Sequence, residues 1–150
     1  TIEETDAENP FVVDAIGSFH DPERGKLRGK NTIHILSADG LRVAHMGDIG
    51  CELNAIQKTM LHGLDAILCP VGGFFTIDAE QAKTMLDELR PGAIIPMHYR
   101  SERFGFDVIG TVEDFTSLYD PARVTFLDTD TLEIRHDMGG GVFVPRYPEA

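Results

Sequence analysis

The chain has 150 residues, 42% of them hydrophobic and 25% charged, which is the composition of one folded domain rather than of a disordered segment. Its net charge is −12, and a field of that sign repels phosphate backbones and anionic lipid, so we expect neither a nucleic-acid nor a membrane partner. The apolar runs are too short to cross a bilayer.

β-Branched and apolar runs beside turn residues predict seven strands. They cover residues 11–18, 32–37, 41–45, 66–69, 93–96, 124–127 and 132–135. The segment Ala38-Asp39-Gly40 predicts a hairpin, because Asp and Gly tolerate positive φ. Residues 21–30 are interpreted as an exposed loop between strands.

Two helices are predicted, over residues 52–61 and 78–89. In the second, apolar residues recur at helical spacing, Asp78 can cap the first turn, and Pro91-Gly92 ends the helix. From residue 41 onward strands and helices alternate, so the sequence predicts an α/β layered fold.

The two cysteines, Cys51 and Cys69, make no disulfide framework, and Cys69 ends an apolar run that predicts a buried thiol. Free thiols without a targeting segment favour a cytoplasmic protein, and the acidic residues 1–6 do not resemble a secretory signal. The chain begins without Met, which leaves two alternatives open: a processed chain, or a piece of a longer one.

Three side chains lie where predicted strands end: His20, Asp48 and His98. Imidazole and carboxylate are ligands that a divalent ion such as zinc accepts, and a bound metal would convert water to a nucleophile near neutral pH. Taken singly, each has an ordinary alternative: Asp48 can cap the helix that follows, His98 can be a packed histidine, and His20 can be a surface residue.

In their order, His20, His45-Met46-Gly47-Asp48, Pro70-Val71-Gly72-Gly73 with Thr76, and Met97-His98-Tyr99 resemble the C-terminal portion of the metallo-β-lactamase superfamily. The nearest branch is its metal-dependent hydrolases with lactonase-like members. The resemblance covers nearly all of residues 1–150 and implies a partial αββα sandwich, the C-terminal portion of one hydrolase domain.

The resemblance also implies a site with up to two divalent metals, for which we expect zinc, with manganese or iron as alternatives. His20 would ligate the first metal, His98 the second, and Asp48 would bridge them as the catalytic residue. A metal-bound hydroxide would then hydrolyse an ester, lactone, amide or phosphoester of a small-molecule substrate. The turn over residues 72–75 would lie beside the substrate mouth.

The sequence departs from the family in one respect: it lacks the His-x-His-x-Asp-His motif that supplies most of the remaining ligands. Three ligands shared between two metals would bind them weakly. We therefore expect a missing N-terminal segment or a second chain to complete the site. The apolar surface left exposed without that half predicts association, so we expect a homo-oligomer.

Residues near these motifs have plainer interpretations. His45 suits a role in orienting Asp48. His34 alternates with Ile33 and Ile35, so it should face away from them and have no catalytic role. A structural role suffices for His62 at the end of a helix, and His136 has no evident partner. Gly72-Gly73 is a turn rather than a phosphate loop, because the ending of a P-loop is missing. Further segments keep two interpretations each: Phe74-Phe75 as core or pocket lining, Thr76 as a helix cap or a reactant, and Arg100 and Arg103 as substrate contacts or solvated loop cations.

Two other functions stay open. A non-catalytic α/β remnant that acts through protein contacts is favoured by the absent ligand motif. A nucleotide-binding α/β domain is disfavoured by the lack of a phosphate loop.

Overall fold

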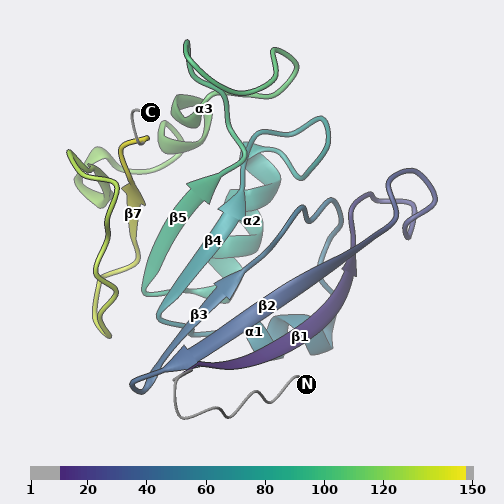
Figure 1. The fold of residues 1–150 in the computed structure, drawn as a ribbon, viewed down its shortest axis with the longest axis horizontal. Helices are drawn as coiled ribbons and strands as arrows, with labels where there is room; N and C mark the ends of the chain where they lie inside the picture. The colour runs from purple at the N-terminus through teal and green to yellow at the C-terminus, as the bar shows by residue number, and fades with distance from the viewer. Residues whose placement is uncertain (1–10, 148–150) are drawn as a thin grey trace.

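A computed structural model describes residues 11–147 as one seven-stranded sheet with helices on one side (Figure 1). The elements are β1 (Val12–Phe19), β2 (Lys30–Ala38), β3 (Leu41–His45), α1 (Ala55–Leu61), β4 (Ala66–Pro70), α2 (Ala79–Leu89), β5 (Ala93–Met97), α3 (Val112–Thr116), a 3₁₀ turn (Pro121–Arg123), β6 (Val124–Phe126) and β7 (Gly141–Val144). The strand order is β1-β2-β3-β4-β5-β7-β6. β1, β2 and β3 pair antiparallel, and the remaining neighbours pair parallel.

The hairpin between β2 and β3 confirms the turn predicted from the sequence. Asp39 and Gly40 both have positive φ, +52° and +75°, which is the geometry of a two-residue hairpin turn. Ala38 pairs with Leu41 directly across that turn.

Each of the two longer helices, α1 and α2, begins with a capping box. Asn54 accepts from the backbone N–H of Gln57 at the start of α1, and Asp78 does the same with Gln81 at the start of α2. The helix predicted over residues 52–61 therefore begins three residues too early, and its cap is Asn54 rather than Asp48.

The two faces of the sheet differ in cover. One face packs Ile35, Ala44 and Ile67 into a large core with Leu86 and Leu89 of α2. The opposite face carries a much smaller buried cluster of Ala66, Ala93 and Ile95. We call this second side the open face, because α1 and α2 both lie behind the sheet in Figure 1.

Cys69 lies in the large core and is fully buried, as its apolar run predicts. Burial raises the pKa of its thiol well above the ordinary range. No helix within residues 11–147 is both long enough and apolar enough to cross a membrane.

The strand predicted over residues 132–135 is wrong. That stretch is irregular, and its Leu132 and Ile134 pack from the side onto the open face. The strand that enters the sheet is β7, where Val142 pairs with Ile94 of β5 and with Val124 of β6. Apolar residues alternate both in residues 132–135 and in β7. Only β7 lies beside β5, where its backbone can pair, and so only β7 forms a strand. The short α3 was also not predicted.

Candidate metal site

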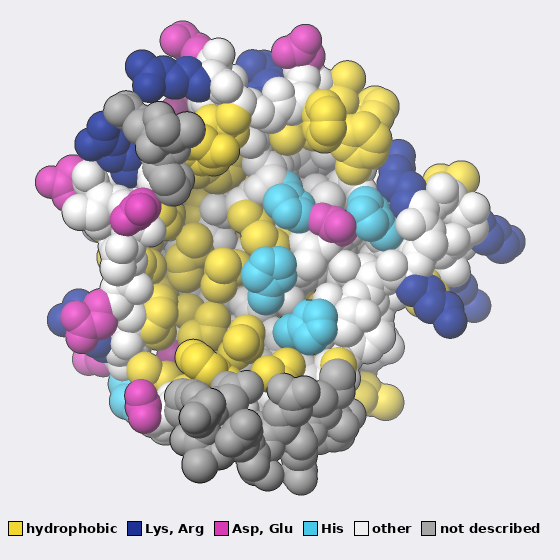
Figure 2. All heavy atoms as spheres, viewed as in Figure 1, with side chains coloured by type: hydrophobic (Ala, Val, Ile, Leu, Met, Phe, Trp, Pro, Cys, Tyr) yellow, Lys and Arg dark blue, Asp and Glu magenta, His cyan; other side chains and the backbone are white. Residues whose placement is uncertain are grey.

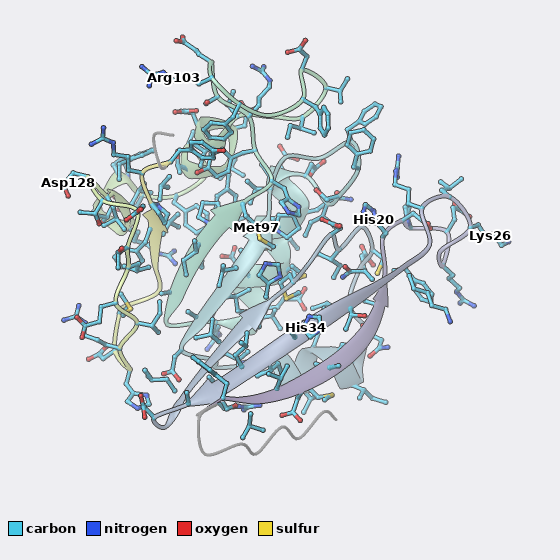
Figure 3. The ribbon with its side chains drawn as sticks, in the orientation of Figure 1. His20, Lys26, His34, Met97, Arg103 and Asp128 are labelled. Carbon is cyan, nitrogen blue, oxygen red and sulfur yellow. The ribbon has the colours of Figure 1, made fainter. Side chains whose placement is uncertain are left out.

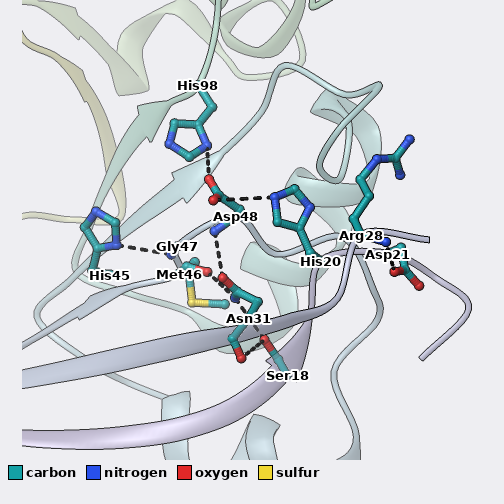
Figure 4. A network of polar contacts seen from close by, with 10 residues as sticks. All are labelled: Ser18, His20, Asp21, Arg28, Asn31, His45, Met46, Gly47, Asp48 and His98. Carbon is teal, nitrogen blue, oxygen red and sulfur yellow. Dashed lines mark hydrogen bonds and ion pairs between the residues drawn. The ribbon is translucent and has the colours of Figure 1, made fainter. Parts of the chain in front are cut away.

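The structure brings His20, Asp48 and His98 together at one edge of the sheet (Figure 4). Each follows a strand: His20 comes directly after β1, Asp48 lies three residues beyond β3, and His98 comes directly after β5. The Nε2 of His20 lies 3.4 Å from Oδ2 of Asp48, and Nδ1 of His98 lies 3.1 Å from Oδ1. The carboxylate is therefore shared, with one oxygen facing each imidazole.

A glycine packs closely against the backbone of each histidine, Gly50 against His20 and Gly72 against His98. A Cβ at Gly50 would lie 2.1 Å from the carbonyl oxygen of His20, and a Cβ at Gly72 would lie 2.0 Å from that of His98. No side chain fits at either distance, so both positions require glycine. His98 itself has a φ of +54°, a strained backbone for a residue with a Cβ.

Asn31 of β2 fixes the turn that carries Asp48. Its Oδ1 accepts the backbone N–H of Asp48 at 2.9 Å, and its Nδ2 donates to the carbonyl of Met46 and to Oγ of Ser18, each at 2.9 Å. Gly47, with a φ of +63°, passes so close that a Cβ would lie 2.5 Å from Asn31 Oδ1. Sequence reasoning did not find Asn31, because a polar residue at the start of a strand carries no distinctive signal.

His45 contacts the same turn from the sheet. Its Nδ1 accepts the backbone N–H of Gly47 at 3.1 Å, so in the neutral ring the proton lies on Nε2. Burial lowers the pKa of His45, and the nearby His98 and His34 lower it further, while Asp48 opposes them. His34 lies opposite His45 in the strand register and is exposed, as its alternation with Ile33 and Ile35 predicts.

Asp21, the residue after His20, is fully buried and organises the loop of residues 21–30, which is otherwise largely exposed, as predicted. Its carboxylate accepts four backbone N–H groups, those of Glu23, Gly25, Leu27 and Arg28, at 2.7–3.0 Å. Burial by itself would raise the pKa of Asp21, but these four hydrogen bonds to the charged form outweigh it and lower the pKa. The Nδ1 of the neighbouring His20 is buried and has no hydrogen-bond partner among residues 11–147.

Two other histidines lie outside this site. His62 is the C-cap residue of α1, consistent with a structural role. His136 contacts Asp65, with Nδ1 2.8 Å from Oδ1, so the interpretation that it lacks a partner is wrong.

Other interpretations are corrected by side-chain contacts. Thr76 donates to the carbonyl of Ile77, and Asp78 caps α2 in its place. The Nε of Arg100 donates to the carbonyl of Ile109 at 2.7 Å, so this guanidinium braces its own loop. Phe74 and Phe75 are exposed, which excludes the core interpretation for both.

The donor chemistry at Asp48 suits a divalent metal, since two imidazoles meet the two oxygens of one carboxylate. The coordination set is incomplete, however. Within residues 11–147 no group of three or more His, Cys, Asp and Glu side chains is arranged to hold one metal ion. Figure 2 shows histidines gathered around a carboxylate on the open face, where further ligands have access.

Comparison with known proteins gives a consistent family. Residues 3–98 match the sequence profile of the beta-lactamase superfamily domain. A protein of Pyrococcus abyssi named as a metal-dependent hydrolase is 29% identical over 99 residues, which make up 65% of this chain and 44% of that protein. Another so named, from Archaeoglobus fulgidus, is 37% identical over 67 residues, 45% of this chain and 29% of that protein. The chain spans less than half the length of these curated relatives.

Solved structures agree with this assignment. A crystal structure from Thermotoga maritima, described as a candidate Zn-dependent hydrolase of the metallo-beta-lactamase superfamily, has a TM-score of 0.77 and 30% identity. The match covers 91% of this chain and 66% of that one. A metallo hydrolase of Ignicoccus hospitalis has a TM-score of 0.59 and 27% identity over 78% of this chain and 48% of its own. These matches confirm the resemblance that the ordered motifs indicate, and the chain belongs to the metallo-β-lactamase superfamily.

Proposed function

We propose that this chain is the part of a metal-dependent hydrolase that contributes His20, Asp48 and His98 to a centre for divalent metal ions, with zinc as the expected ion. The observation that carries the proposal is the pair of contacts on Asp48, at 3.4 Å from His20 and 3.1 Å from His98. A carboxylate with one imidazole at each oxygen suits a ligand shared between two ions. The hydrolase names of the relatives and the zinc in the Thermotoga maritima description support the same reading.

The remaining ligands would come from outside residues 11–147, either from another segment of the full-length protein or from a second chain. Two observations support this part of the proposal. The described residues hold no complete ligand group, and the chain spans less than half of its curated relatives. The side chain of Asp48 is 52% exposed and is therefore accessible to such a segment. Figure 2 shows histidines around a carboxylate on the open face.

A divalent metal held there would polarise the substrate's carbonyl or phosphoryl oxygen and activate water, which suits cleavage of an ester, lactone, amide or phosphoester. The chain's own residues would set the geometry. Asp48 would hold the ions at a fixed separation. The side chain of Asn31 would keep the turn in place by accepting the backbone N–H of Asp48. His45 would brace the same turn at Gly47. The substrate would be a small molecule.

The test is an elemental analysis of the full-length protein, run together with hydrolysis assays. Asp48→Ala should lower bound metal and hydrolysis together, because it removes the shared ligand. Asp128→Ala is the matched control, since Asp128 is exposed and lies far from His20 (Figure 3), and it should change neither quantity.

Full metal content in Asp48→Ala would overturn the shared-ligand role. A wild-type protein without metal or hydrolysis would favour the non-catalytic alternative instead.

A further inference from the structure

An aromatic cluster lies exposed beside the candidate metal site. Phe74 and Phe75, in the loop after β4, meet edge to face with ring centroids 4.7 Å apart, and Phe75 meets Phe106, in the loop after β5, at 6.1 Å. The three residues are 62%, 38% and 72% exposed. Single exposed apolar residues are common, but three large rings that contact one another in water indicate a binding surface.

The backbone holds one of these rings outward under strain. Phe74 has a φ of +63°, in the left-handed region that bulky residues avoid. Such strain persists only where the surroundings impose it, and it concentrates at ligand sites. Gly73 beside it also has a positive φ, +70°, so the loop turns sharply before the rings.

Hydrogen bonds fasten the two aromatic loops to each other, and the loop after β5 begins with His98 itself. The N–H of Gly110 donates to the carbonyl of Gly72 at 2.7 Å, and the N–H of Val71 donates to that of Met97 at 3.0 Å. Gly72 also packs against the carbonyl of His98 too closely for any Cβ. The position of the rings is therefore coupled to the position of His98.

A third loop borders the cluster from the side of His20. The guanidinium of Arg28 lies over the ring of Phe75, 5.7 Å from its centroid. The N–H of Arg28 donates to Asp21, the residue next to His20, at 2.7 Å. The rings thus border both loops that bring the histidines to Asp48, since Phe106 belongs to the loop of His98 and Phe75 contacts Arg28 in the loop of His20. Figure 2 shows an apolar cluster on the same face as the histidines.

We propose that Phe74, Phe75 and Phe106 form the subsite for an aryl or alkyl group on the acyl side of the substrate. The substrate class is then an ester or lactone with an apolar group next to the scissile carbonyl, rather than a small polar ester. This inference rests on the proposed hydrolase function. A polyanion that stacks its bases on the rings is disfavoured by the net charge of −12.

The experiment compares methyl phenylacetate with methyl acetate on the full-length protein. Water cleaves either ester to methanol and the carboxylic acid, so the two substrates differ only in the phenyl group. We expect a higher kcat/KM for the phenylacetate, and a ratio that falls about fivefold in Phe75→Ala and in Phe106→Ala, the scale of one aromatic contact. Phe126→Ala, which removes an exposed ring on β6 at the end of the sheet, should leave the ratio unchanged.

A binding measurement separates this subsite from the reaction. Phenylacetate, but not acetate, should shift the backbone amide resonances of residues 73–76 and 104–107, and Phe74→Gly, which relieves the positive φ and removes a ring, should weaken that shift while the protein stays folded. Hydrolysis of both esters at equal kcat/KM, or no phenylacetate-specific shift, overturns the subsite and leaves the hydrolase proposal standing. Ring-dependent phenylacetate shifts without hydrolysis of either ester support the apolar subsite and overturn the assignment of an ester substrate.

Discussion

Gly72 and Gly50 set the positions of the two histidines at Asp48 by leaving no room for a side chain. In each case a Cβ would lie about 2 Å from a histidine carbonyl, well inside van der Waals contact. The obstacle is backbone rather than the end of a flexible side chain, so the loops themselves would have to move. The absence of a side chain at Gly50 and Gly72 is therefore as necessary to this site as its imidazoles and carboxylate.

A substitution at Gly72 tests this constraint. Gly72→Ala should lower the free energy of unfolding by about 1–3 kcal/mol, the usual cost of forcing an extra carbon into a packed place. It should also weaken metal binding by the full-length protein, because the loop of His98 shifts. The measurements are urea unfolding and metal titration.

Gly17→Ala is the matched control for that substitution. A Cβ at Gly17 would meet no atom within 4 Å, so its unfolding free energy should stay within about 1 kcal/mol of wild type. Equal unfolding curves for the two variants would contradict the claim that Gly72 constrains His98.

The loop between β1 and β2 is an element built around one carboxylate. Asp21 has no exposed surface, and its two oxygens collect four N–H groups from residues 23–28. Because the carboxylate replaces the hydrogen bonds that a strand or helix would supply, a loop rich in Gly and charge is ordered next to His20. The same loop positions Arg28 over the aromatic cluster.

The pH dependence of stability should report on Asp21. Its pKa is lowered in the folded state from an ordinary value of 3.8, so its stabilisation is fully present above about that pH. The stabilisation is lost as pH falls through the lower folded pKa. Asp21→Asn should therefore be less stable than wild type at neutral pH, because an amide N–H₂ faces N–H donors, and the difference should shrink in acid.

Unfolding free energies measured from neutral pH down to pH ~3 check this expectation. Asp128→Asn removes an exposed carboxylate and serves as the control. A gap between wild type and Asp21→Asn that does not change with pH would show that hydrogen bonds to the charged carboxylate do not stabilise the loop.

Elements with local signals could be predicted from the sequence, whereas the choice between two similar apolar segments for one place in the sheet could not. The Asp39-Gly40 turn and the Asp78 cap depend on neighbouring residues alone, so the hairpin and α2 were predicted. Residues 132–135 and β7 compete for one place beside β5, and only the three-dimensional sheet decides between them.

Part of the candidate site could likewise be predicted from the sequence, and part could not. His20, Asp48 and His98 were found through their order along the chain, and the ligand roles assigned to them stay predictions. Asn31 and the buried carboxylate of Asp21 act through distances that no sequence pattern encodes.

At the scale of the whole molecule, residues 11–147 form a sheet with helices on one side only. Helices and the large core fill one face, whereas Val43, Leu68 and Phe143 of the open face are only partly buried, with the irregular segment before β7 beside them. An apolar sheet face of this kind is normally packed against another layer. Figure 2 shows histidines around a carboxylate near the middle of the same face, so a layer that covered this face would also enclose the candidate site.

The 150-residue chain by itself should therefore associate through the open face. Sedimentation equilibrium should show mass rising with concentration, because contact between two such faces removes apolar surface from water. The double variant Val43→Thr and Leu68→Thr should shift the equilibrium toward monomer by weakening that contact. The control, Ile56→Thr with Met60→Thr, alters exposed residues on α1 behind the sheet and should leave association unchanged. A wild-type chain that stays monomeric at every concentration would show that the open face does not drive assembly, and equal effects of the two double variants would assign the contact to another surface.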